Sequence, residues 1–374
     1  MKRSITALIG CMICILAALP MHKAQAAEAG NLIQMAILLD TSSSMDGLID
    51  QAKTQLWKIV NEMARAKKNG QSPMLEVALV EYGNSGLSAE QGYIRMVAPL
   101  TTDLDRISEA LFKLTTNGGD EYCGQVIQSA VTKLKWSDKS DILKMIFIAG
   151  NEPFTQGRIY YKEACKAAIT KGIVVNTIFC GDSREGERSN WKDGALLADG
   201  RYMSINQNQE IVHIQAPQDA EIIRLGEALN KTYVSYGAEG EKNMARQSEQ
   251  DEKAAAAAPQ VMVQRSVTKS SKQYSNSSWD LVDAVAAGSV NLATLPAEKL
   301  PETMKKMDTQ ERKRFVEKMK KEREQIQLQI QKLNDERRKY VTRIRHKRAE
   351  ENTLDSAMVE AVREQAVKKN YVIE

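Results

Sequence analysis

The sequence is poor in the residue types that many nucleic-acid and zinc sites require. Aromatic residues make up only 5% of the chain, so it lacks the stacking platform with which single-strand binders hold bases. It has three histidines, and outside residues 1–26 no two of its cysteines have the Cys-x-x-Cys spacing of a zinc site. Gly118-Gly119 lacks the Gly-Lys-Ser/Thr ending of a phosphate loop. We therefore expect neither nucleic-acid binding nor a zinc site.

Long apolar runs are also missing, except at the N-terminus. Residues 5–19 are apolar, follow two basic residues, and precede Ala24-Gln25-Ala26, which is a small-residue cleavage signature. The run is shorter than the roughly 20 residues that cross a bilayer, and Pro20 interrupts it. The pattern predicts a signal peptide over residues 1–26 and export to the periplasm or the medium, without stable membrane insertion.

The chain has no strong excess of one charge. Its formal net charge is +4, and the leader holds Lys2, Arg3 and Lys23 but no acid, so the mature chain carries about +1 (4 − 3). The basic isoelectric point therefore belongs partly to the leader. A basic cluster at 343–348 can contact anionic lipid or nucleic acid, but its acidic flanks favour a solvated helix face.

Cysteines are few as well, and Cys123, Cys165 and Cys180 remain after the leader. An odd number in an oxidising compartment allows one disulfide and one free thiol, and a bridge from Cys123 to either of the others is one hypothesis. Cys123 also stands at the start of an expected helix, where a thiolate is favoured, with His213 as a conceivable base. Its place on an apolar stripe favours a packed cysteine, and we expect the protein not to be an enzyme.

The chain does contain a regular alternation of strand and helix patterns between residues 33 and 237. Six segments have the composition of strands: 33–39, 75–82, 93–98, 142–149, 173–180 and 201–205. Several are almost wholly apolar, as buried parallel strands are, and apolar residues at helical spacing separate them. The pattern predicts an α/β fold with a doubly wound, mostly parallel six-stranded sheet.

Composition changes after residue 237. Residues 238–278 are rich in Ala, Gln, Ser, Lys and Glu, which predicts a linker or a loosely helical connector. Residues 279–374 form a charged helical region, in which Met319, Ile326, Leu333 and Tyr340 recur every seven positions. This repeat favours a coiled coil or helical hairpin. Because Arg323 and Arg337 interrupt a second such series, a single solvated helix packed partly on the main domain is the alternative.

The strongest chemical signal is Asp40-Thr41-Ser42-Ser43-Ser44, directly after the first buried run. An Asp and two Ser at alternate positions on a strand-to-helix turn can direct three oxygens at one hard cation. The alternative is that Asp40, Ser42 and Ser44 cap the following helix, as such residues often do.

In this setting Asp40-x-Ser42-x-Ser44 resembles the metal-ion-dependent adhesion site of von Willebrand factor A-type domains. The resemblance covers residues 31–237 and implies a Rossmann-like domain that binds protein partners, often through a divalent ion. Segments 118–124 and 148–154 look like an exported bacterial branch of that family.

The other two motifs of the family pattern are substituted. A Thr usually follows the Gly-Gly loop, and here Glu121 stands at that position, with Asp120 as the neighbouring choice. An Asp usually ends the next buried strand, and here Asn151 replaces it. The resemblance implies a modified site for Mg²⁺, or for Mn²⁺ or Ca²⁺, in which the ligands are Asp40, Ser42, Ser44, Glu121 and Asn151.

The function implied is that of an exported protein–protein interaction module, for adhesion or assembly, that docks a partner's exposed Asp or Glu on the ion. The C-terminal helices would add a surface for oligomerisation. The alternative is a metal-free structural scaffold of the cell envelope that acts through those helices. A thiol-dependent hydrolase is a third hypothesis and rests on Cys123 alone.

Overall fold

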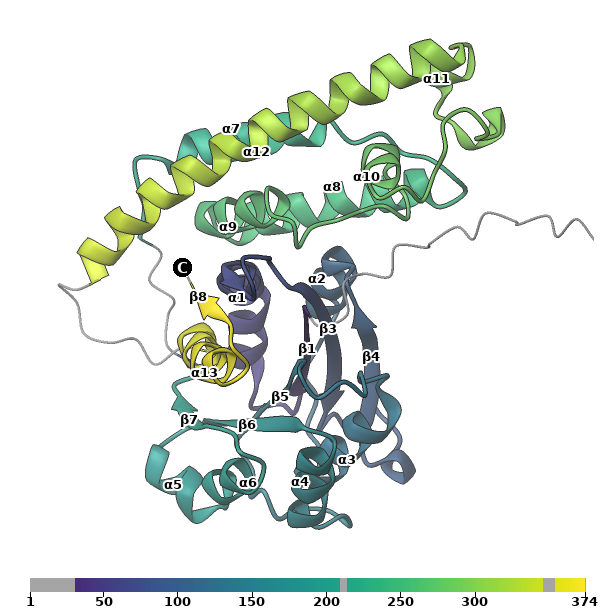
Figure 1. Ribbon diagram of the computed structural model, residues 1–374. Helices are drawn as coiled ribbons and strands as arrows, with labels where there is room; N and C mark the ends of the chain where they lie inside the picture. Colours follow the sequence, from purple (N-terminus) through teal and green to yellow (C-terminus); the bar gives the residue numbers. More distant parts are fainter. Residues whose placement is uncertain (1–30, 209–213, 346–353, 374) are drawn as a thin grey trace, which may run out of the picture. The chain divides into compact units, whose positions relative to one another are not determined.

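In the computed structural model, which describes residues 31–208, 214–345 and 354–373, the alternating part of the chain builds a six-stranded sheet (Figure 1). Its strands are β1 (Leu32–Asp40), β3 (Met74–Tyr82), β4 (Ile94–Thr101), β5 (Leu143–Gly150), β6 (Ile173–Cys180) and β7 (Tyr202–Ile205). They lie in the order β4-β3-β1-β5-β6-β7, and every neighbouring pair is parallel except β3 and β4. The predicted doubly wound, mostly parallel sheet is confirmed.

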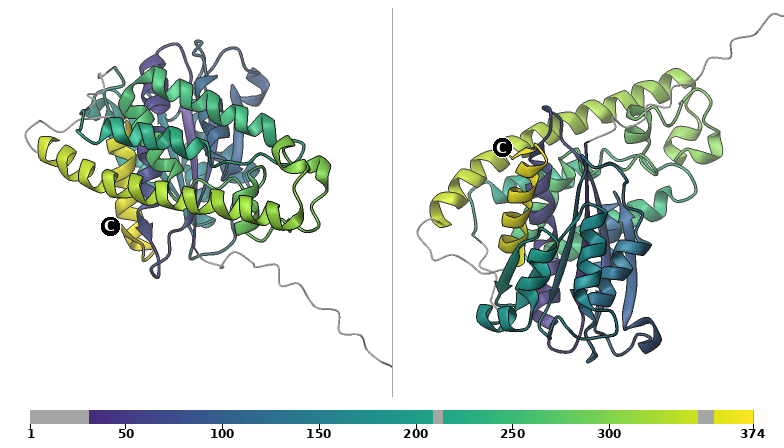
Figure 2. Two further views of the ribbon diagram at one scale, coloured as in Figure 1. Left: turned by 90° about the horizontal axis from the view of Figure 1, so that it is seen from above. Right: turned by 60° about the horizontal axis from the view of Figure 1, so that its bottom comes forward.

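Helices cover both faces of this sheet (Figure 2). One face carries α1 (Asp46–Ala64), α2 (Leu104–Phe112) and α13 (Leu354–Lys368). The other face carries α3 (Cys123–Lys133), α4 (Tyr161–Thr170) and α6 (Trp191–Leu197). The short helix α5 (Ser183–Arg188) comes directly before α6 in the chain. The short helix η1 (Ala89–Gln91) lies in the connection between β3 and β4.

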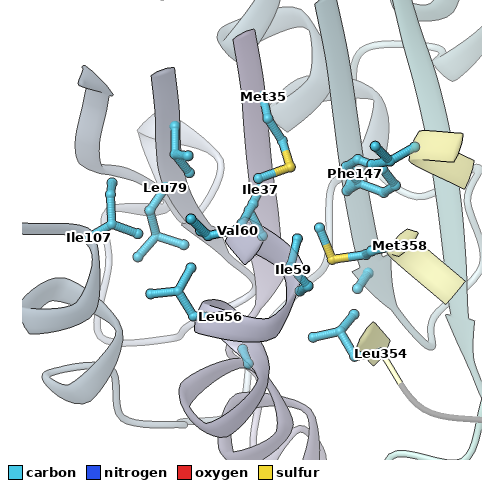
Figure 3. Packing of buried hydrophobic residues seen from close by; sticks show 14 of the residues in the cluster. Met35, Ile37, Leu56, Ile59, Val60, Leu79, Ile107, Phe147, Leu354 and Met358 are labelled. Carbon is cyan, nitrogen blue, oxygen red and sulfur yellow. The ribbon is translucent and has the colours of Figure 1, made fainter. Parts of the chain in front are cut away.

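The two faces follow from the strand geometry of β1, because successive side chains of a strand point to opposite sides. Met35 and Ile37 pack in the core on the α1 side, whereas Ala36 and Leu38 belong to the core on the α3 side. An almost wholly apolar run is therefore required for a central strand covered on both faces. Figure 3 shows how β1, β3, β5, α1 and α13 contribute to the first of these cores.

The segment expected as a linker or a loosely helical connector is helical in the structure. After α7 (Asp219–Asn230), the chain forms α8 (Gly240–Ala257) and α9 (Pro259–Lys269). Ala254, Val261 and Met262 belong to the same core as the buried residues of α1, and other residues of α9 pack on α7. The sequence did not indicate this packing, because these few apolar residues are spaced among many polar ones and average composition hides their common face.

The charged region that follows contains α10 (Leu281–Ala286), η2 (Ala297–Lys299), α11 (Glu302–Lys305) and the long helix α12 (Thr309–Arg345). α12 packs against α7, α9 and α10 rather than pairing with a second heptad helix among the described residues. Arg323 and Arg337 belong to this contact, because both are buried and ion-paired, the first with Asp280 at 2.6 Å and the second with Asp219 at 2.6 Å. Of the two interpretations of the sequence, the single helix packed partly on the main domain is therefore the one that describes α12.

The end of the described chain returns to the sheet. α13 lies on the same face as α1, with Leu354, Met358 and Val362 fully buried against it. Beyond α13, β8 (Val372–Ile373) pairs antiparallel with β2 (Ala66–Lys67), the short strand that follows α1. The C-terminal residues therefore complete the main domain instead of forming a separate region.

Residues 1–30 lie outside the described part of the chain, so the signal peptide remains a prediction. A search of the helices in the described ranges found none with the length and apolar character of a membrane span.

All three cysteines of the described chain are buried and free, in contrast to the bridge considered from the sequence. Burial raises the pKa of Cys165 to about 12 and that of Cys123 well above its ordinary value, so both thiols are held in the unreactive protonated form. We expect the native mature protein to resist alkylation and the unfolded, unreduced protein to take three alkyl groups in a mass spectrum. A single alkyl group on the unfolded chain would instead reveal a disulfide.

Candidate functional site

The site is at the carboxyl edge of the sheet, between β1 and β5. The chain leaves β1 toward α1 on one face and leaves β5 toward α4 on the other. This divergence makes the edge a topological switch point, where open α/β sheets bind ligands. Asp40 is the last residue of β1, and Asn151 directly follows β5.

Asp40 is fully buried. Its Oδ1 accepts a hydrogen bond from the backbone N–H of Ser42 at 2.7 Å, which fixes the turn. Its Oδ2 is also buried but has no hydrogen-bond partner among the described residues. A buried carboxylate oxygen without a partner is costly, so this atom marks a position where a cation or donor is needed.

Ser42 and Ser44 lie side by side on the turn, with their Oγ atoms 3.3 Å apart. Ser42 is buried and Ser44 is exposed, so the pair leads from the interior to the surface. The N-cap of α1 is Met45, and no described side chain caps the helix there. The capping alternative for these residues therefore does not describe the structure.

Glu121, and not its neighbour Asp120, stands beside Asp40. The Glu121 carboxyl is buried beside Asp40 and Ser42, and its Oε2 accepts a hydrogen bond from the backbone N–H of Glu152 at 3.3 Å. Asp120 is exposed and accepts a hydrogen bond from the Tyr122 hydroxyl at 3.1 Å. The residue immediately before the start of α3 is Tyr122, so Glu121 lies in the loop that faces β1.

The two carboxyl groups make the site electrostatically strained without a cation. Burial raises the pKa of Asp40 well above its ordinary value, and the adjacent Glu121 raises it further. Burial likewise raises the pKa of Glu121. Such a pair is stable either with a shared proton or with a positive ion beside it.

Asn151 contributes to the site from the end of β5. Its Nδ2 donates to the Oγ of Ser44 at 3.4 Å, while its Oδ1 is buried with no partner in the part of the chain that the structure describes. All five residues expected from the sequence thus gather at one edge, joined through Ser42 and Ser44. The oxygens come from carboxylates, hydroxyls and an amide, and among the described residues no group of three His, Cys, Asp or Glu side chains is placed to hold a metal ion.

Two glycines that sequence reasoning passed over shape the site. A Cβ on Gly83 would come within 2.6 Å of Asp40 Oδ1, and the φ of +80° there also disfavours other residues. A Cβ on Gly150 would lie 2.4 Å from the Tyr82 hydroxyl. Gly83 directly follows β3, in the connection to β4, and no local signal in the sequence tied it to Asp40.

Gln207 is a second missed contributor, because its Nε2 donates to the backbone carbonyl of Ser44 at 2.9 Å. It supports the serine turn from the segment that follows β7. Nothing in the sequence near Gln207 indicates this contact, which depends on how the sheet brings the ends of β1 and β7 to one edge.

Cys123 does not have the environment of a nucleophile. It is fully buried at the start of α3, 3.9 Å from the Tyr82 hydroxyl, and burial raises its pKa. His213, the base considered from the sequence, lies outside the described residues. The hydrolase hypothesis therefore gains no support from the surroundings of this thiol.

The fold and the site together define an α/β domain that gathers oxygen side chains at the switch point of its sheet. Residues 34–195 match the family model of the von Willebrand factor type A domain. The chain therefore contains a von Willebrand factor type A domain. No curated protein sequence matches the chain significantly.

Similar solved structures include proximal thread matrix protein 1 from the mussel byssus, described with a zinc occupied MIDAS motif, at 16% identity and a TM-score of 0.36. That match covers 47% of this chain and 42% of the mussel protein, so the chain spans well under two thirds of its length. The protein BatB from Bacteroides thetaiotaomicron is 18% identical with a TM-score of 0.35, over 46% of this chain and 90% of that one. The pilus adhesin SpaC from Lactobacillus rhamnosus GG is 16% identical with a TM-score of 0.35, over 47% of this chain and 28% of that one.

Proposed function

We propose that the protein is an exported interaction module that docks a carboxylate of a protein partner on a divalent cation, most simply Mg²⁺. Asp40, Ser42, Ser44, Glu121 and Asn151 would hold the ion. The observation that carries this proposal is the pair of buried oxygens, Asp40 Oδ2 and Asn151 Oδ1, that have no partner among the described residues. Both are hard oxygen donors of the kind that Mg²⁺, Mn²⁺ and Ca²⁺ prefer.

Each residue has a distinct part in this proposal. The two acids, Asp40 and Glu121, supply the negative charge that a divalent ion needs, and Glu121 makes up for the charge absent at Asn151. Ser42 and Ser44 add neutral oxygens, and the exposure of Ser44 leaves the site open to solvent and to a partner. When bound, the cation would accept a carboxylate oxygen of the partner as a further ligand. This is a binding role, and we propose no catalysis.

Loss of one carboxylate is the direct test of the ion site. We expect Glu121→Gln to weaken Mg²⁺ or Mn²⁺ binding at least about tenfold in calorimetry, because a buried charged ligand becomes neutral. Asp120→Asn is the matched control, since this exposed neighbour contacts Tyr122 rather than Asp40, and its affinity should equal that of the parent. Equal losses in the two variants, or no binding of Mg²⁺, Mn²⁺ or Ca²⁺ by the parent, would refute the ion site.

Partner docking needs a separate experiment. The mature protein and its Asp40→Asn variant, each immobilised, are exposed to envelope extract with and without a chelator. We expect proteins retained by the parent to be released by the chelator and to be missing with Asp40→Asn. If the chelator and the Asp40→Asn substitution both leave the retained proteins unaffected, the alternative is favoured. That alternative is a metal-free scaffold that acts through its C-terminal helices.

A further inference from the structure

A second, unrelated feature is a cleft of about 980 Å³ on the side of the domain away from the ion site. Its walls are the C-terminal half of α1, one side of α9, and the C-terminal half of α12, with Arg363 of α13 at one end. Figure 1 shows α12 passing over α9 and ending on the side where α1 and α13 lie. The volume is at the upper end of the range usual for small-molecule pockets.

The charge of this cleft is strongly positive. The described residues that line it include seven Lys or Arg side chains but two acids, Glu62 and Asp335, a formal charge of +5 (7 − 2). The whole chain carries only +4, so the excess is local. The four arginines of the lining are Arg65, Arg337, Arg338 and Arg363.

The acids in the cleft do not balance these arginines. Arg337 is paired outside it, with Asp219. Glu62 is shared by two guanidinium groups, with Arg65 Nη1 at 3.0 Å and Arg363 Nε at 2.7 Å. Asp335 lies 3.6 Å from Arg338, a loose contact within one helix turn. The Nε of Arg65 is buried and has no hydrogen-bond partner among the described residues.

Crowding of like charge is visible at Arg338. Burial lowers its pKa, and the nearby Arg65 and Arg363 lower it further, whereas the carboxylates of Asp335 and Glu62 raise it. Three guanidinium groups therefore share two carboxylates here. Such an arrangement reduces stability unless a ligand supplies negative charge. Guanidinium groups are well suited to phosphate, which they bind through paired hydrogen bonds.

The rest of the lining limits the size and kind of ligand. No described residue of the cleft wall is aromatic, so the cleft offers no stacking surface for a base. Hydroxyl and amide side chains outnumber aliphatic ones between the arginines, and they include Asn61, Ser271 and Thr342. These features suit a compact and very polar ligand.

We infer that this cleft between α1, α9, α12 and α13 binds a small soluble polyanion that carries two or more phosphate-type groups, through Arg65, Arg338 and Arg363. The site is independent of the ion site, since it shares no residue with it. The bound anion joins α12 to α1 and α13, so it also holds the long helix on the domain.

Tripolyphosphate is the probe for the test, used with the mature protein in low salt and with a chelator present, so that metal binding does not contribute. In calorimetry we expect Arg338→Gln to weaken binding at least about tenfold. Arg224→Gln is the matched control, because Arg224 also pairs with an acid three residues earlier on its helix, Glu221, but lies outside the cleft. Its affinity should stay within about twofold of the parent, as expected for a distant surface charge.

Thermal melts separate a ligand site from a structural cluster. Tripolyphosphate should raise the melting temperature of the parent and of Arg224→Gln but leave Arg338→Gln unchanged, because only a ligand of the folded state stabilises it in this way. Absence of binding by the parent, or equal losses in both variants, would overturn the inference. The inference would also be overturned if the protein bound vesicles that contain anionic lipid but failed to bind tripolyphosphate. The site would then recognise a membrane surface.

Discussion

A chain that ends at residue 353 is expected to lose its cooperative fold, although the family match itself stops at residue 195. The truncation removes α13, whose Leu354 and Met358 pack in the core with α1 and the sheet (Figure 3). Val362 of the same helix is fully buried in that core as well. Burial of three such side chains contributes about 5 to 9 kcal/mol. Because a domain is usually stable by only about 5 to 15 kcal/mol, the shortened chain should be unfolded or aggregated, as circular dichroism and gel filtration would report.

Point variants of α13 keep this prediction testable if the truncated chain cannot be purified. Met358→Ala should lower the free energy of unfolding in urea by about 2 to 5 kcal/mol, because the cavity is in a closed core. Val367→Ala on the same helix, with its side chain 65% exposed, should change it by less than about 0.5 kcal/mol. A truncated chain that melts cooperatively at the parent's temperature would show that α13 is dispensable. The same packing means that deletion of residues 279–374 cannot isolate an intact domain for ion-binding tests.

Replacement of Arg265 by Met is the second change with a large expected effect, a loss of about 3 to 5 kcal/mol. Arg265 is fully buried on α9 and joins three helices. Its Nη1 donates to Asp105 of α2 at 2.7 Å, its Nε donates to Asp251 of α8, and its guanidinium lies 4.7 Å from the ring centroid of Trp57 on α1. Without it, buried carboxylates at Asp105 and Asp251 lose their main partner.

Arg246→Gln is the control, because Arg246 also connects α8 with α2 but through a more open contact. It pairs with Asp103 at 2.7 Å and with Glu109 at 3.4 Å, and its side chain is 18% exposed. Urea unfolding should show a loss of no more than about 1 kcal/mol for this variant. If the two variants lose the same free energy of unfolding, burial of the Arg265 ion pairs does not explain the loss in Arg265→Met.

The pH dependence of stability gives a second test of the ion pairs that Arg265 forms. Burial alone would raise the pKa of Asp251, but Arg265 and Lys269 outweigh it and lower that pKa below its ordinary value. The pair's stabilisation is therefore present above the unfolded pKa of about 4 and is lost as the pH falls through the lower folded value. With Arg265 replaced, the folded pKa of Asp251 rises, so acid unfolding should begin at a higher pH than in the parent.

Much of the fold could be predicted because its signals are local. The apolar run that ends at Asp40 has the pattern of a strand covered on both faces, and the turn after it is short enough for the sequence to place Ser42 and Ser44 beside it. The resemblance to the family pattern, rather than a local signal, assigned Asn151 after the next buried strand. These residues meet because parallel strands present their carboxyl ends at one edge of the sheet.

From the family pattern the sequence assigned Glu121 to the site and kept Asp120 as the neighbouring choice, so the choice between the two acids was not final. It depends on the backbone of the loop before α3, which turns Glu121 toward Asp40 and leaves Asp120 in solvent. The contributions of Gly83 and Gln207 were hidden for the same reason, since their contacts with the site join segments far apart in the chain.

The sequence by itself therefore determined the class of sheet, the order of its elements and the position of the oxygen-rich turn, because strand and helix periods are properties of short segments. Only the tertiary structure decided what the residues after 237 do. The few apolar side chains of α8, α9 and α12 specify a helix face but not its partner, and that partner is chosen by packing across the whole molecule. Arg323 and Arg337 of α12 are buried for the same reason, because Asp280 and Asp219 meet them only once the chain has folded.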